Sequence, residues 1–131
     1  MVTTHCGMRA CARQLATVVT VDCDIDASNV DAVTQYVTRY VLAEKPFVLD
    51  LSAVNSMSPH GVSLLLALDD KCDDAGVEWE LVANPIVMDA IADDIDIATL
   101  PVSASVARAL AYFADMTRRR RRLLPALPKS A

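Results

Sequence analysis

Apolar and polar positions divide the chain into short runs typical of strands and longer segments typical of helices. Four apolar runs have the length and the branched or aromatic side chains of strands: residues 8–13, 16–21, 47–51 and 77–83. Over residues 28–43, valines instead recur every three or four positions, which places them on one face of a helix. We expect a capping box to start this helix, with Ser28 as the cap and Asp31 reaching back to it.

A second helix is expected from about Pro59 to Asp74, because Pro favours the first helical position and Gly76 follows as a helix end. Four of its apolar residues are expected to pack inward: Val62, Leu65, Leu66 and Leu68. Its last turns carry aspartates, which we expect to face water.

The rest of the chain predicts two more helices and a short strand. Pro85 opens a helix over residues 85–93, and residues 98–102 suit a brief edge strand. A last helix begins at a cap on Ser103 or Ser105 and ends near Met116.

Strands that alternate with helices predict an α/β fold with a mostly parallel central sheet and right-handed crossovers. We expect about four to five strands packed by about four helices, on one face of the sheet or on both. Residues 1–116 form this single domain, and residues 117–131 are expected to be a basic, disordered tail.

The net charge of −5 is unevenly distributed along the 131 residues. Residues 118–129 hold six of the twelve basic residues, so residues 1–117 carry 6 basic against 17 acidic side chains, a net −11. Such a body repels nucleic acid and suits a protein partner with a basic surface. The arginine run could still contact nucleic acid or membrane, although a solvated tail is the simpler interpretation.

No apolar run approaches the roughly 20 residues that span a bilayer, so we expect no membrane insertion. The N-terminus lacks the order of a signal peptide, and a cytoplasmic location is therefore predicted. The cysteines are scattered and are expected to be reduced thiols: Cys6, Cys11, Cys23 and Cys72. His5 and His60 lie at no ligand spacing, so no metal is expected.

Candidates for catalysis are few. His60 could act as a general base, but no partner carboxylate is evident in the sequence. Asp22, Asp24 and Asp26 could bind a cation, although a solvated acidic strand end is the simpler explanation. With three glycines, the chain has neither the dinucleotide-binding nor the P-loop motif, so we expect no cofactor and no enzyme activity.

The sequence Ser-Pro-His-Gly at the start of the second helix has a clearer physical interpretation. Ser58 is a good N-cap, Pro59 suits the first helical position and His60 follows as the second. A helix N-terminus attracts anions and disfavours a protonated imidazole, so His60 should be mostly neutral near pH 7. An ordinary helix start with a solvent-facing imidazole would explain the same residues.

The segment "FVLDLSAV", a loop ending at Met57 and the helix-opening Gly61 together resemble the signature of STAS domains. "CDIDASN", "NPIVMDAI" and "SVARAL" resemble further elements of that family in the right order, so the similarity covers about residues 8–113. The resemblance implies partner switching by an anti-sigma-factor antagonist. Such a protein binds a serine-kinase-type anti-sigma factor, and phosphorylation of a serine at this helix start breaks the complex.

This chain departs from the family at that serine. With Met57 and Gly61 aligned, His60 stands where the family has its phosphoacceptor, and Ser58 and Ser63 are the substitute acceptors. A serine kinase cannot use an imidazole as its acceptor. Ser58, as an N-cap, would also have its oxygen engaged.

The resemblance also implies a partner surface, with Met57 and Val62 as apolar anchors and carboxylates that steer a basic partner. Its expected residues are Asp24, Asp26, Asn55, Met57, Ser58, His60, Gly61 and Val62. The expected partner is an anti-sigma factor or a related serine protein kinase, without direct nucleic-acid contact. A regulatory STAS subunit of a membrane transport complex is the alternative, a nucleotide-binding or catalytic role is a third hypothesis, and weak self-association stays open.

Overall fold

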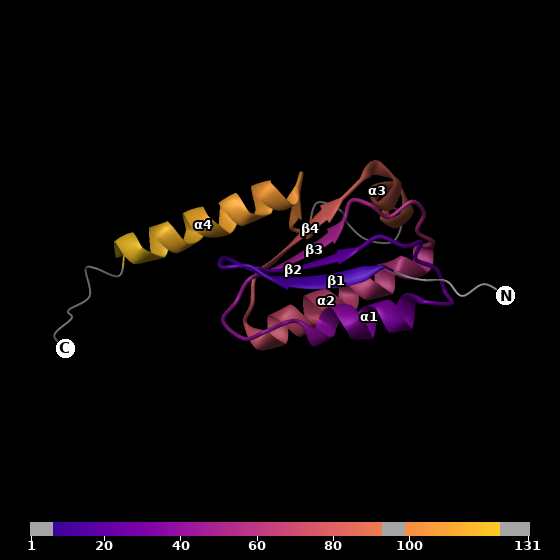
Figure 1. Cartoon of the computed structure of the whole chain (residues 1–131), viewed down its shortest axis with the longest axis horizontal. Coiled ribbons are helices and arrows are strands. Elements are labelled where there is room, and N and C mark those ends of the chain that lie inside the picture. The colour runs from indigo at the N-terminus through magenta and orange to yellow at the C-terminus, as the bar shows by residue number, and fades with distance from the viewer. Residues whose placement is uncertain (1–6, 93–98, 124–131) are drawn as a thin grey trace.

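A five-stranded mixed sheet forms the centre of the molecule (Figure 1). The computed structural model describes residues 7–92 and 99–123, with side chains as far as residue 120. The strands lie in sequence order: β1 (Met8–Ala12), β2 (Thr17–Val21), β3 (Phe47–Leu51), β4 (Trp79–Ala83) and β5 (Val102–Ser103). Only β1 pairs antiparallel with its neighbour; the other strands run parallel. The predicted α/β class and the adjacency of β2, β3 and β4 are confirmed.

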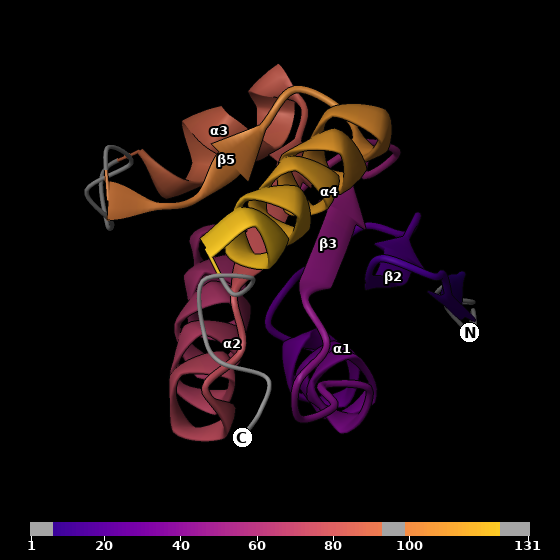
Figure 2. The ribbon, with the colours of Figure 1, turned by 90° about the vertical axis from the view of Figure 1, so that its left-hand side faces the viewer.

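Helices cover both faces of the sheet (Figure 2). The helical elements are α1 (Val30–Arg39), η1 (Pro59–Gly61), α2 (Val62–Ala75), α3 (Pro85–Ile91) and α4 (Val106–Leu123). The helices α1 and α2 pack on one face, and α4 crosses the other. Right-handed crossovers between parallel strands in sequence order place α1 and α2 on the same face, and α4, which follows the last strand, covers the other.

Alternation along the strands builds two separate cores. On β3, Phe47, Leu49 and Leu51 belong to the large core under α1 and α2. Val48 points to the other face, where Ala109 and Phe113 of α4 cover it. Because both faces are buried, the central strands are continuous apolar runs, as expected for parallel sheets.

The last helix extends seven residues beyond the predicted end at Met116, so the expectation of a disordered chain from residue 117 is wrong for residues 117–123. Arginine is a good helix former, and Asp115 accepts ion pairs from Arg118 at 3.8 Å and from Arg119 at 3.2 Å. The remainder of the predicted tail lies outside the described residues.

The capping box predicted at Ser28 is also wrong. The helix α1 begins at Val30, and its N-cap is Asn29 without a side-chain cap hydrogen bond. Asp26 instead accepts hydrogen bonds from the backbone N–H and hydroxyl of Ser28, at 2.8 and 2.5 Å. The carboxylate that orders this turn therefore precedes the helix and does not lie within it. The predicted cap on Ser105 is confirmed, because its Oγ accepts from the N–H of Arg108.

Cys11 and Cys72 carry free thiols, as expected, whereas Cys23 is disulfide-bonded and corrects the expectation of a reduced thiol there. Across residues 7–92 and 99–123, no group of histidine, cysteine or acidic side chains is arranged to hold a metal ion. None of the helices in these ranges is both long and apolar enough to cross a membrane.

Candidate functional site

Two loops join at the carboxyl end of the sheet, one after β2 and one after β3. Ile25 and Met57 form an isolated parallel bridge. The N–H of Ile25 donates to the carbonyl of Ser56 at 3.1 Å, and the N–H of Ser58 donates to the carbonyl of Ile25 at 2.9 Å. The structure therefore brings the segment of Asp24 and Asp26 next to the segment that leads to His60.

The helix start at Ser58 has the predicted cap but a tighter first turn. Ser58 Oγ accepts the N–H of His60 at 3.2 Å and lies 3.2 Å from His60 Nδ1. The residues Pro59–Gly61 form a 3-10 turn, and α2 proper begins at Val62. The side chain of Ser58 is thus engaged locally, as the N-cap role requires.

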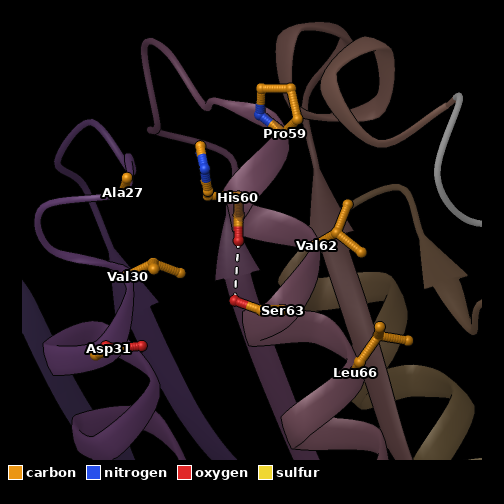
Figure 3. A pocket seen from close by; sticks show the side chains of 8 residues that line it. All are labelled: Ala27, Val30, Asp31, Pro59, His60, Val62, Ser63 and Leu66. Atoms are coloured by element: carbon orange, nitrogen blue, oxygen red, sulfur yellow. Dashed lines mark hydrogen bonds between the residues drawn. The ribbon is translucent and has the colours of Figure 1, made fainter.

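Ser63 lies one turn further along and is exposed. Its hydroxyl donates to the carbonyl of His60 at 2.9 Å, so it satisfies an oxygen in the first turn of the helix (Figure 3).

An open groove lies between the start of α1 and the start of α2 (Figure 3). Its volume is about 690 Å³, and eight residues line it: Ala27, Val30, Asp31, Pro59, His60, Val62, Ser63 and Leu66. The imidazole of His60 lies at its upper edge, on the side of Ala27. Leu66 is 53% exposed, and the prediction that it packs inward is wrong.

The carboxylate of Asp26 accepts hydrogen bonds from Ser28 and Asn29. Its hydrogen bonds from the hydroxyl and the N–H of Ser28 hold the pKa of this carboxyl below its ordinary value of 3.8, and the charge of His60 lowers it further. The neighbouring Asp24 is exposed, and its carbonyl accepts from Asn29 Nδ2 at 2.7 Å. The bridge between Ile25 and Met57 brings this acidic segment next to the segment that leads to His60.

Met57 and Val62 do not have the exposure expected of apolar anchors. Each is only 8% exposed, and both belong to the main core. Met57 packs against the buried Gly61, where an added Cβ would lie 2.2 Å from its Cε. A glutamate at position 57 would consequently disturb the core. Leu66, expected to be buried, is instead an exposed apolar side chain of the groove.

Asn84, the residue between β4 and α3, supports the site, and its role was also missed. Its Nδ2 donates to the carbonyls of Ser52 and Val54 at 3.1 and 2.8 Å, and its Oδ1 caps α3 by accepting from the N–H of Val87 at 2.9 Å. Asn55, which follows Val54 in the loop after β3, is exposed. One side chain thus fixes both the loop after β3 and the start of α3.

The chain is similar to known proteins both in sequence and in fold. A family model described as the STAS domain matches residues 8–109. Osmosensory protein A of Mycobacterium tuberculosis is 43% identical over 129 residues, which cover 95% of this chain and 82% of that protein.

Solved structures share the fold at lower identity. An anti-sigma factor antagonist from Mycobacterium paratuberculosis superimposes with a TM-score of 0.74 at 24% identity, covering 84% of this chain and 95% of that one. A chain of the stressosome gives 0.65 at 14% identity, over 84% and 99% of the two chains. SLC26A9 gives 0.64 at 18% identity, over 84% of this chain and 21% of that one.

Proposed function

Because the chain belongs to the STAS domain family, we propose that it is a regulatory protein of the anti-sigma-factor-antagonist type. It would bind a serine-kinase-type anti-sigma factor and so release a sigma factor. The observation that carries this proposal is the joining of the two loops through Ile25 and Met57. This junction brings the segment of Asp24 and Asp26 next to the segment that leads to His60, and Ala27, Asp31 and His60 line one open groove.

The surface has the chemistry of a protein-binding site more than that of a catalytic one. The groove combines the exposed part of Leu66 with the carboxylate of Asp31. The body carries a net −11, so its field attracts a basic partner surface before contact. A partner that supplies an apolar side chain and a cationic one would satisfy both features.

His60 changes how such a complex would be regulated. A kinase that forms phosphoserine transfers a phosphoryl group to a hydroxyl oxygen, which His60 lacks. Both hydroxyls make a local hydrogen bond with the backbone of His60, and Ser63 is the more exposed of the two. We therefore propose that binding is not released by phosphorylation at position 60, and that any phosphoserine control acts through Ser63.

The 43% identity to osmosensory protein A supports a link between this partner binding and osmotic conditions. In that case the amount of anti-sigma factor captured from cells would change after an osmotic shift. If this change in captured anti-sigma factor depends on residues of the groove, the response to osmotic conditions acts through this surface.

The test is capture of partners from native lysate by tagged protein, with identification by mass spectrometry. We expect a soluble kinase-fold protein with the wild type and its loss with Leu66→Glu. The matched control is Leu42→Glu, because Leu42 is 49% exposed but lies in the turn after α1, away from the groove. Absence of any kinase-type protein, or equal capture by both variants, would overturn the proposal. Capture of a membrane transport protein would favour the alternative of a transport subunit.

Phosphopeptide mapping after incubation with the captured partner and ATP tests the regulation. Phosphate on Ser63 would place the switch three residues beyond His60. Tight binding in ATP with no phosphate on Ser58 or Ser63 would indicate an antagonist that this kinase does not release.

A further inference from the structure

The end of α4 carries a cluster of cations that the proposed function does not use. Beyond Phe113, the last buried residue of this helix, α4 runs past the sheet (Figures 1 and 2). Arg118, Arg119 and Arg120, here called the basic end, have side chains that are 62%, 69% and 64% exposed. Their own ion pairs are at the surface, where such pairs contribute little.

The last two turns of α2 carry a net negative charge, with Lys71 as their one cation. Asp70, Asp73 and Asp74, here called the acidic end, are exposed and make no ion pair with any residue in the described ranges. No basic residue lies in the last turn of this helix. Carboxylates are disfavoured at a helix C-terminus, where the helix dipole is negative. The acidic end therefore has an unfavourable electrostatic environment that a docked cation would improve.

Both clusters lie at the amino end of the sheet, opposite the His60 groove. Arg120 Nη2 lies 3.9 Å from Glu78 Oε1, just before β4, and α2 ends at Ala75. However, α2 and α4 pack on opposite faces of the sheet. Arg118 and Arg119 pair with Asp115 of their own helix instead of with α2.

From this arrangement we propose that a second copy of this chain docks here, with the basic end of each copy on the acidic end of the other. A two-fold axis would make each contact twice, which is the usual form of a self-complementary interface. A nucleic acid is the less favoured occupant, because the body beside the basic end carries a net −11. This inference does not rest on the proposed function, since the groove lies at the other end.

Sedimentation equilibrium with charge-swapped variants tests the contact. At low ionic strength we expect the mass to rise with concentration from 14.1 kDa toward twice that value. At about 1 M salt, where the Debye length is about 3 Å, we expect the monomer. Arg118→Glu/Arg119→Glu and Asp73→Arg/Asp74→Arg should each weaken self-association at least about tenfold.

Mixing these two variants gives the decisive result. One variant then has both clusters acidic and the other has both basic, so the mixture should form a heterodimer although neither variant associates alone. The matched controls, Arg9→Glu/Arg108→Glu and Asp22→Arg/Asp89→Arg, change the net charge equally at exposed residues elsewhere and should self-associate like the wild type.

Thermal unfolding of each variant shows that it is folded before its mass is interpreted. A wild type that stays monomeric at low salt would overturn the proposal. So would folded swap variants that associate normally, or a mixture that fails to associate. Binding of a double-stranded oligonucleotide that is lost in Arg118→Glu/Arg119→Glu, without self-association of the wild type, would assign the basic end to nucleic acid instead.

Discussion

Replacing Gly61 by alanine tests whether the close contact between this residue and Met57 sets the geometry of the site. The backbone of Gly61 has φ −62° and ψ −17°, which alanine adopts without strain. The added Cβ would nevertheless lie 2.2 Å from Met57 Cε and 2.7 Å from Met57 Cγ. The packing of Met57 therefore opposes the change.

The expected magnitude combines two opposing effects. Alanine gains about 0.5–1 kcal/mol over glycine in helical backbone. Overpacking of a buried site costs about 1–3 kcal/mol, because Met57 must leave its position in the core. We expect Gly61→Ala to lower the free energy of unfolding by about 1–2 kcal/mol. Met57→Ala alone should lower it by about 2–5 kcal/mol.

The double variant Met57→Ala/Gly61→Ala separates the contact from other effects. Once the long side chain is absent, the new Cβ has room, so the double variant should lose less than the sum of the single variants by about 1–3 kcal/mol. Urea unfolding followed by circular dichroism measures all four free energies.

Gly76→Ala provides the control. Gly76 has φ +68° and no atom within 4 Å of an added Cβ, so its replacement costs about 1–2 kcal/mol through backbone strain alone. It should show no coupling to Met57→Ala. If Gly61→Ala is as stable as the wild type, or if its cost simply adds to that of Met57→Ala, the steric argument is refuted.

Two further predictions concern titration and reactivity. Because the pKa of Asp26 is lowered by Ser28, its ionised form contributes stability above the ordinary value of 3.8, and this contribution is lost as the pH falls through the lower, folded-state pKa. The urea midpoints of wild type and Asp26→Asn should therefore differ at pH 7 and converge in acid; a constant difference would contradict this. Burial and the charge of Asp69 raise the pKa of Cys72 to about 12, so iodoacetamide should label the exposed Cys11 first at pH 8. Peptide mapping of the labelled native protein checks the order, and equal labelling would contradict it.

The strands and the buried face of the first helix were predictable because buried positions carry apolar residues at regular spacing in the sequence. Val30, Val33 and Val37 are all buried on α1, at the spacing that predicted them. The central strands were recognised as apolar runs because parallel strands with both faces covered carry few polar residues. Leu66 was misplaced because α2 is apolar on several faces at its start, and periodicity then cannot separate the exposed face.

Other features of the site are not indicated by any pattern of neighbouring residues in the sequence. Asn84 hydrogen bonds to carbonyls 30 and 32 residues away, and no spacing in the sequence indicates that contact. The capping box at Ser28 failed because Asp26, two residues earlier, accepts the Ser28 N–H that Asp31 was expected to reach. The extension of α4 was missed because a run of arginines resembles a solvated tail, although arginine also favours helices.

The topology keeps the two proposed contacts physically independent. In a parallel sheet, the loops after β2 and β3 emerge at the carboxyl end, whereas crossover helices such as α2 end at the amino end. A dimer joined through the amino ends would therefore leave the groove at His60 open on both copies. It follows that Arg118→Glu/Arg119→Glu should still capture the partner that Leu66→Glu loses, and that Leu66→Glu should still self-associate. Loss of both properties in one folded variant would mean that the two ends communicate through the sheet.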